Sequence, residues 1–243
     1  MPVPVRPTEV SIIARRYLFW FALTWLLCAG ASAGDPATAH NGVDRVHSNG
    51  KTALMAAAKA GDSERMRALL EQGVDVNQPN KNGGTAIMYA VLSGKSEPVS
   101  LLLEHHAHVD AVAKNGWTPL MIAAVKGYVE VARLLLKHGA EPNRGDVYSW
   151  TPLMRAVYEQ RPRMVRLLVE NDPTDVNRAG ENGVTALHLA VAREDADTVR
   201  LLLSRDADPT IMDNSGRTAL DFARQNGDMG LLRLMDVGHR DRH

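Results

Sequence analysis

The sequence predicts an all-α repeat solenoid of six stacked helix-turn-helix units, joined by short β-hairpin-like loops. Three observations predict this fold. A threonine recurs every 33 or 34 residues, a similar apolar phrase follows each threonine, and a second apolar block lies further along each unit. Self-similarity at such a period is typical of repeat proteins, whose units bury a core only by stacking on their neighbours.

Each threonine and its phrase predict a short inner helix. The threonine hydroxyl can cap the first exposed amides, and a proline directly after it suits a first helical turn. Leucines and alanines recur at helical spacing and predict the face that packs on neighbouring repeats. The threonines are Thr52, Thr85, Thr118, Thr151, Thr185 and Thr218, and the phrases are TALMAAAKAG, TAIMYAVLSG, TPLMIAAVKG, TPLMRAVYEQ, TALHLAVARE and TALDFARQNG.

The second apolar block, such as Leu101-Leu102-Leu103, predicts an outer helix in each unit. Asn-Gly or Ser-Gly pairs before five of the threonines predict turns, because glycine adopts a positive φ without strain. Some units carry another residue where a glycine is expected. These residues are His106, Ser149, Gln160, Glu194 and Asp206. The fourth unit also has one extra residue near positions 171–175, where we expect a local bulge.

The period and phrases such as TPLMIAA resemble the ankyrin repeat and its T-P-L-H-x-A signature. The resemblance covers about residues 48–236, with repeats one to six starting near residues 48, 80, 113, 146, 180 and 213. His188 stands at the signature histidine position, which in this family supports hydrogen bonding between repeats. The polar residues of the last phrase predict a C-terminal cap, and residues 237–243 a polar tail.

The first 33 residues predict a cleavable signal peptide. Arg15 and Arg16 precede a charge-free apolar run over residues 17–28, and Ala31-Ser32-Ala33 forms a cleavage site. We expect the cut between Ala33 and Gly34, followed by a linker over residues 34–47. An uncleaved signal anchor, lipidation at Cys28 and a twin-arginine route are the alternatives. The expected location is therefore periplasmic or secreted, with no membrane insertion after cleavage.

Composition and motifs limit the classes of function that this sequence can have. Lys plus Arg and Asp plus Glu both number 28, so no excess basic charge predicts nucleic-acid binding. No H-E-x-x-H or G-x-S-x-G motif is present, which predicts a protein that is not an enzyme and needs no cofactor. His105, His106 and His108 are the weak candidates for a metal site, since imidazole binds zinc; the alternative is a solvated helix end.

The resemblance implies binding of a protein partner through the hairpin tips and the concave inner-helix face. Trp117 and Trp150 occupy equivalent positions in adjacent repeats, and tryptophan and tyrosine are enriched in binding hot spots. Alternatively, both rings pack on a neighbouring hairpin and stiffen the row of tips. The predicted partner-binding residues are Lys114, Asn115, Trp117, Lys126, Tyr148, Trp150, Tyr158 and Glu159.

These observations predict a monomeric, non-enzymatic protein-protein interaction module exported to the periplasm. The bacterial setting rests on a resemblance to short exported ankyrin-repeat proteins of bacteria. One alternative is a secreted effector that acts on a host or competitor protein. A further alternative is a histidine-based metal binder.

Overall fold

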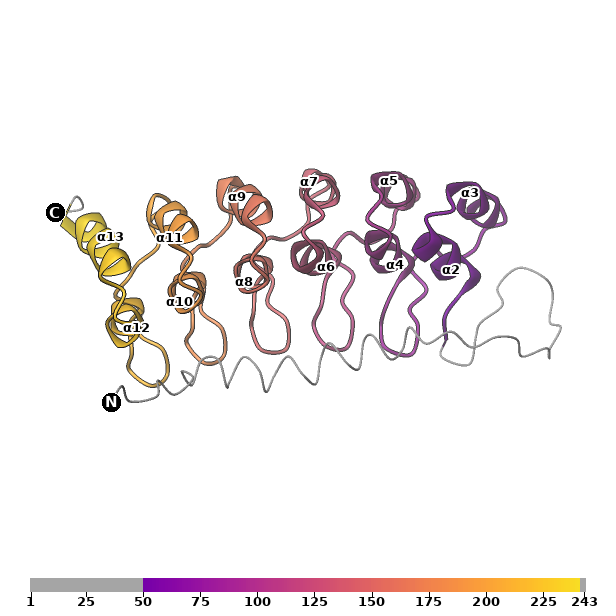
Figure 1. The fold of residues 1–243 in the computed structure, drawn as a ribbon. Coiled ribbons are helices and arrows are strands. Elements are labelled where there is room, and N and C mark those ends of the chain that lie inside the picture. Colours follow the sequence, from indigo (N-terminus) through magenta and orange to yellow (C-terminus); the bar gives the residue numbers. More distant parts are fainter. Residues whose placement is uncertain (1–49, 241–243) are drawn as a thin grey trace, which may run out of the picture. The chain divides into compact units, whose positions relative to one another are not determined.

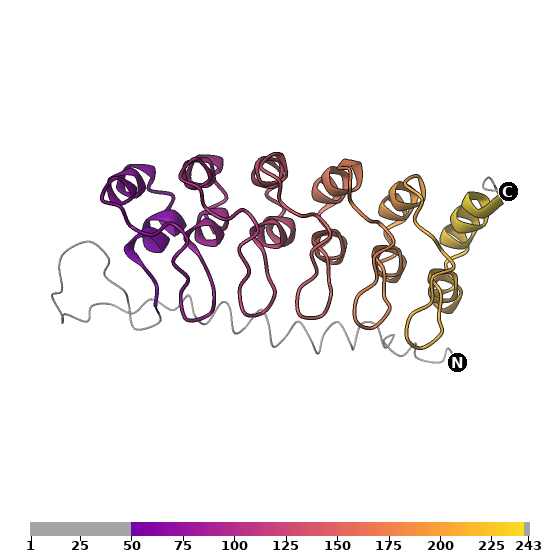
Figure 2. The ribbon, with the colours of Figure 1, turned by 180° about the vertical axis from the view of Figure 1, so that it is seen from behind.

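The computed structural model describes residues 50–240, where twelve helices stack as six pairs. The inner helices form one row and the outer helices a second row above it (Figure 1). The connections between pairs extend as long loops on the side away from the outer helices, in both views (Figures 1 and 2). The all-α repeat solenoid is thereby confirmed, while the predicted signal peptide and linker lie outside the described residues.

Each pair joins a short inner helix to an outer helix. The inner helices are α2 (Ala53–Ala60), α4 (Ala86–Leu92), α6 (Pro119–Lys126), α8 (Pro152–Tyr158), α10 (Ala186–Ala192) and α12 (Ala219–Asn226). The outer helices are α3 (Ser63–Glu71), α5 (Ser96–Glu104), α7 (Val129–Lys137), α9 (Pro162–Glu170), α11 (Ala196–Leu203) and α13 (Met229–Arg240). The last helix extends past residue 236, where the sequence predicts the end of the array. None of the helices described is long and apolar enough to cross a bilayer.

The periodic threonines begin the inner helices as the sequence predicts. Five of them accept a hydrogen bond from the backbone N–H three residues later, as Thr118 Oγ1 does from Met121 at 3.3 Å. Thr85 is the exception, since its buried hydroxyl makes no cap bond and no hydrogen bond with any described residue. The register therefore holds in all six repeats, while the cap bond forms in five.

The core lies between neighbouring pairs. Met55, Met88, Met121 and Met154, one per repeat, are each at most 1% exposed. In the fifth repeat, His188 takes their position and bonds both within and between repeats. It completes a capping box with Thr185, and its Nε2 lies 3.3 Å from the Arg217 carbonyl oxygen. The inter-repeat hydrogen bond implied by the family resemblance is thus present.

Backbone conformation follows the glycine pattern. Non-glycine residues with a positive φ within the described range are His106, Ser149, Gln160, Glu194 and Asp206, the same five that the sequence places at glycine positions. The extra residue of repeat four lies in the loop after α9, where the Thr174 N–H donates to the Asn171 carbonyl at 2.9 Å. The loop absorbs the insertion, and α9 keeps the nine-residue length of α5 and α7.

Candidate functional site

The tips of the interhelical hairpins form a continuous row. A backbone N–H on one tip donates to a carbonyl on the preceding tip. These bonds are Lys114 to Asn82 at 2.9 Å, Val147 to Asn115 at 3.2 Å, Glu181 to Tyr148 at 3.0 Å and Asn214 to Asn182 at 3.0 Å. Because each tip is tied to the next, side chains at equivalent tip positions are held at one-repeat spacing.

A polar side chain at the base of the tip closes three of these turns. Asp146 Oδ1 accepts the backbone N–H groups of Tyr148 at 2.9 Å and Trp150 at 3.0 Å. Asn80 and Asp213 accept the equivalent pairs in repeats two and six. Burial would raise the pKa of Asp213, but hydrogen bonds from Arg217 and Ser215 and the Arg217 charge outweigh it, so this pKa lies below its ordinary value.

Arg155 in α8 reaches back to the tip of its own repeat. Its guanidinium pairs with the Asp146 carboxylate, and both side chains are almost fully buried. The same guanidinium lies over two indole rings, 5.3 Å from the centroid of Trp117 and 4.8 Å from that of Trp150. The two tryptophans of adjacent repeats therefore enclose one arginine, a geometry that favours cation–π attraction.

The contacts continue toward repeat five. The rings of Trp150 and Tyr158 meet edge to face with centroids 5.6 Å apart, and the Arg193 guanidinium lies 4.2 Å from the Tyr158 centroid. We call this set the aromatic–arginine stack, made of Trp117, Arg155, Trp150, Tyr158 and Arg193. It crosses three repeats and combines buried Arg155 with three half-buried rings and the exposed Arg193 side chain.

The aromatic side chains of the predicted site pack within the array. A Cβ placed on Gly180, in the next hairpin, would lie 3.1 Å from Cδ1 of Trp150. Trp150 thus packs on the neighbouring hairpin as well as on Arg155. Both tryptophans and Tyr158 remain half-exposed, so their contact with a partner stays a prediction.

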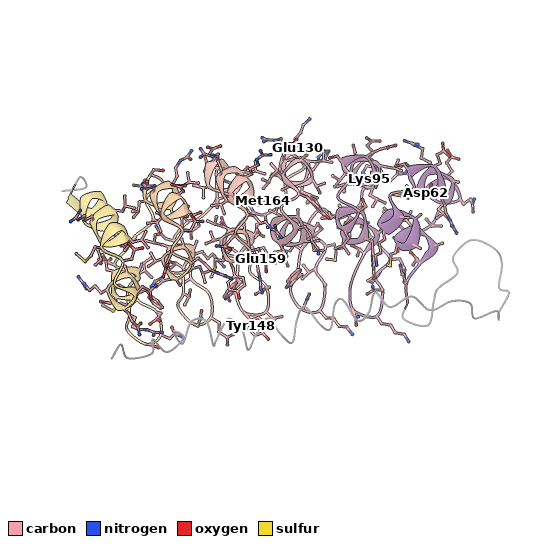
Figure 3. The ribbon with its side chains drawn as sticks, in the orientation of Figure 1. Asp62, Lys95, Glu130, Tyr148, Glu159 and Met164 are labelled. Carbon is pink, nitrogen blue, oxygen red and sulfur yellow. The ribbon has the colours of Figure 1, made fainter. Side chains whose placement is uncertain are left out.

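The remaining predicted residues lie at tips and helix ends. Lys114 is exposed at the third tip, where Asn115 Oδ1 accepts the Trp117 N–H at 3.1 Å. Lys126 and Glu159 hold equivalent places at the ends of α6 and α8. Figure 3 shows Tyr148 at a hairpin tip and Glu130 on the outer helix α7, on opposite sides of the array.

Repeats one to three are basic on the hairpin side. Their tips and inner-helix ends carry Lys51, Lys59, Lys81, Lys114 and Lys126, which we call the lysine row. The Lys51 ammonium lies 5.3 Å from the ring centroid of Tyr89. Burial lowers the pKa of Lys51 below its ordinary value, and the nearby charge of Lys59 lowers it further. Positive charge is therefore concentrated at this end of the site.

The three candidate metal-binding histidines are exposed at the end of α5 and in the loop after it. The His106 carbonyl accepts from Asn77 Nδ2 at 3.2 Å, and the His108 N–H donates to Asn77 Oδ1 at 2.8 Å, which joins repeats one and two. Within residues 50–240, no group of three or more His, Cys, Asp or Glu side chains is placed to hold a metal ion.

Family models for ankyrin repeats match most of the sequence. A three-copy model matches residues 21–113 and 99–180, and a many-copy model matches residues 168–223. The chain belongs to the ankyrin repeat family. An ankyrin repeat domain from Acinetobacter baumannii superposes with a TM-score of 0.71 at 28% identity, covering 76% of this chain and 97% of that one. A second solved ankyrin repeat protein superposes with a TM-score of 0.69 at 29% identity, covering 76% of this chain and 96% of that one.

Curated relatives match over shorter stretches. The mitochondrial disaggregase of Bos taurus is 41% identical over 66 residues, which are 27% of this chain and 10% of that protein. An ankyrin repeat-containing protein of Treponema pallidum is 41% identical over 63 residues, 26% of this chain and 21% of that protein. The matched stretches thus span about a tenth to a fifth of these relatives.

Sequence reasoning missed Arg155, the centre of the aromatic–arginine stack. Four residues after the periodic threonine, the other repeats carry Ala56, Tyr89, Ile122, Leu189 and Phe222. A charged residue at a register that is otherwise uncharged, five residues after Trp150, was the available signal. A buried charge needs a partner, and Asp146 at the base of the same hairpin provides it.

Proposed function

We propose that this chain is a non-enzymatic protein-protein interaction module that is exported to the periplasm. It binds one protein partner through its hairpin tips and the adjoining inner-helix ends. Ankyrin repeats are protein-protein interaction modules, and their fold is generally a non-catalytic scaffold. The observation that carries the choice of surface is the aromatic–arginine stack, which collects four half-exposed or exposed groups around buried Arg155.

The stack is suited to recognition because its geometry is set before a partner arrives. Asp146 fixes Arg155 and closes the turn that presents Tyr148 and Trp150. Backbone bonds between tips hold Trp117 and Trp150 in adjacent repeats. A preorganised surface loses less side-chain freedom on binding, which raises affinity for the same contacts.

The proposal of export rests on the N-terminal sequence. A basic segment, an apolar run over residues 17–28 and Ala31-Ser32-Ala33 appear in the order of a secretory signal. Its removal would also remove Cys28, the single cysteine of the chain. A cysteine-free remainder suits an oxidising compartment, where no wrong disulfide can then form.

Site-specific photo-crosslinking tests the proposed surface. A photoreactive amino acid is placed at Val147, which is 51% exposed at the fourth tip, and in a matched variant at Glu130 on α7. When the full-length gene is expressed, we expect an ultraviolet-dependent adduct of the Val147 variant in the periplasmic fraction, and none of the Glu130 variant. Equal adducts at both positions would show that the tips are not the binding surface.

Osmotic-shock fractionation and N-terminal sequencing test the export. The expected result is a periplasmic protein that begins at Gly34. Recovery in the culture medium would favour the secreted effector instead. Retention in the cytoplasm with an intact N-terminus would refute export, whichever surface crosslinks.

A further inference from the structure

The lysine row is set apart from the rest of the surface by its charge. In repeats one to three, the four residues before each threonine and the positions seven and eight residues after it include five lysines and no acidic residue. In repeats four to six, the same positions hold two acidic and two basic residues, Glu159, Glu181, Arg193 and Arg217. The basic surface is therefore confined to one end of the hairpin side.

The outer helices carry charges of both signs, and some of these charges lie in ion pairs. Arg67 pairs with Glu97 between α3 and α5 at 2.9 Å, and Glu130 lies near Arg133 in α7. By contrast, Lys81, Lys114 and Lys126 are exposed and form no ion pair with a described residue. Lys81 and Lys114 hold equivalent positions in adjacent tips, and clustered like charges attract an oppositely charged partner and speed its association.

From these observations we propose that the lysine row binds an extended acidic segment of the protein partner, with a carboxylate at about every third residue. This inference rests on the proposed interaction function and names the chemistry of its partner. Packed helices lie about 8–10 Å apart, so neighbouring tips repeat at about that distance. A chain in the extended polyproline II conformation rises about 3.1 Å per residue with three residues per turn, so every third side chain lies on one face and matches one repeat.

A protein segment fits this surface better than a nucleic acid does. Proteins that hold single strands stack the bases on open aromatic faces. Here the Arg155 guanidinium lies over both Trp117 and Trp150, and Lys51 lies over Tyr89. Five lysines also neutralise few phosphates, in a chain whose basic and acidic residues are equal in number.

Fluorescence anisotropy with defined peptides tests the inference on the exported protein. The probe is a fluorescein-labelled peptide of about twelve residues with glutamate at every third position, separated by serine and alanine. One control peptide carries glutamine in place of glutamate, and another has the same composition with its glutamates contiguous. A thymidine oligonucleotide of similar length represents nucleic acid.

Charge reversal supplies the matched variants. The test variant combines Lys81→Glu with Lys114→Glu, and its control combines Lys137→Glu with Arg163→Glu on the outer helices α7 and α9. We expect the test variant to raise the Kd of the spaced peptide at least about tenfold and the control variant to change it less than about twofold. Raising the NaCl concentration from about 50 to about 300 mM should weaken binding of the spaced peptide to the protein without substitutions.

Three results would overturn the inference: equal effects of the two variants, equal binding of the glutamine peptide, or tighter binding of the oligonucleotide. Tighter binding of the contiguous peptide would refute the spacing of one carboxylate per three residues. The crosslink at Val147 separates this inference from the proposed function. An adduct that survives Lys81→Glu with Lys114→Glu, together with no peptide binding, refutes the acidic segment and leaves the interaction module standing.

Discussion

Arg155 and Asp146 form a buried ion pair that joins an inner helix to the base of its own hairpin. The Asp146 side chain is 0% exposed and that of Arg155 is 9% exposed. Asp146 also accepts two backbone N–H groups of the turn, so its carboxylate is satisfied on both sides. Loss of one partner from such a pair leaves an uncompensated charge and typically destabilises a protein by about 3–5 kcal/mol.

Arg155→Leu should therefore lower the free energy of unfolding by about 3 kcal/mol. The double variant Asp146→Asn with Arg155→Tyr should recover most of this loss. It installs the neutral pair of repeat two, where Asn80 Nδ2 donates to the Tyr89 hydroxyl at 2.9 Å. Urea unfolding followed by circular dichroism measures both effects, and a double variant no more stable than Arg155→Leu would contradict the interpretation.

The control for Arg155 is an exposed ion pair. Arg67 and Glu97 lie 2.9 Å apart, and their side chains are 50% and 65% exposed. Exposed pairs contribute about 0–1 kcal/mol, since solvent screens them. Arg67→Leu should therefore shift the urea midpoint much less than Arg155→Leu does.

The threonine caps provide a second matched pair. Thr118→Val should destabilise the array by about 1 kcal/mol, because it removes the cap bond to the Met121 N–H. Thr85→Val should be nearly neutral or slightly stabilising, since the Thr85 hydroxyl is buried without a hydrogen-bond partner among the described residues. Thermal unfolding of the two variants measures the difference. An equal loss at both positions would mean that the valine shape, and not the hydroxyl, sets the effect.

Backbone strain at the inter-helix turns predicts a gain in stability. Gln160 and Glu194 have φ values of 51° and 56°, at the position where Gly61, Gly94 and Gly127 stand in the first three repeats. A left-handed conformation costs a non-glycine residue about 1 kcal/mol. Gln160→Gly and Glu194→Gly should each raise the free energy of unfolding by a few tenths to about 1 kcal/mol. The gain is smaller than the full cost of the strain, because glycine also increases the conformational freedom of the unfolded chain.

Gly139→Ala is the reverse test of the same strain. Gly139 has a φ of 85°, and a Cβ added there would meet no atom within 4 Å. Backbone conformation is therefore the main cause of any loss, which urea unfolding should show as about 1 kcal/mol. If Gly139→Ala left the free energy of unfolding unchanged, there would be no basis for expecting a gain in stability from Gln160→Gly and Glu194→Gly.

The periodic threonines and the glycine positions made most of this fold predictable. One threonine per period fixes the start of each inner helix, and five non-glycine residues at glycine positions keep the φ that the register requires. Both features are local, because they depend on residues within one turn or cap. Repetition along the chain then shows which local signals belong together.

The centre of the site was less predictable because it depends on contacts between repeats. Arg155 lies four residues after Thr151, and charged side chains are seldom fully buried. Its burial follows from Asp146 nine residues earlier and from an indole in each of two repeats. Periodicity indicated the side on which the tryptophans lie, but it could not show that one guanidinium occupies a face of both.

His188 should make the stability of the array depend on pH. Burial lowers the pKa of its imidazole below the ordinary value near 6.5; the hydrogen bond to the Arg217 carbonyl and the Asp213 charge oppose this shift, and the Arg217 charge reinforces it. Because the folded-state pKa is the lower one, protons bind more readily to the unfolded chain. The resulting stability is complete above about pH 6.5 and is lost as the pH falls through the folded-state pKa.

His188→Met removes this dependence by installing the residue that the first four repeats carry at the same position. Between about pH 7 and about pH 5, the urea midpoint should fall less in His188→Met than in the parent. His105→Met is the control, because the His105 side chain is exposed at the end of α5, and it should keep the parent slope. The absolute stability of His188→Met also reflects its lost capping box, so the slope is the deciding quantity. Parallel slopes for His188→Met and the parent would show that this imidazole is not the group responsible.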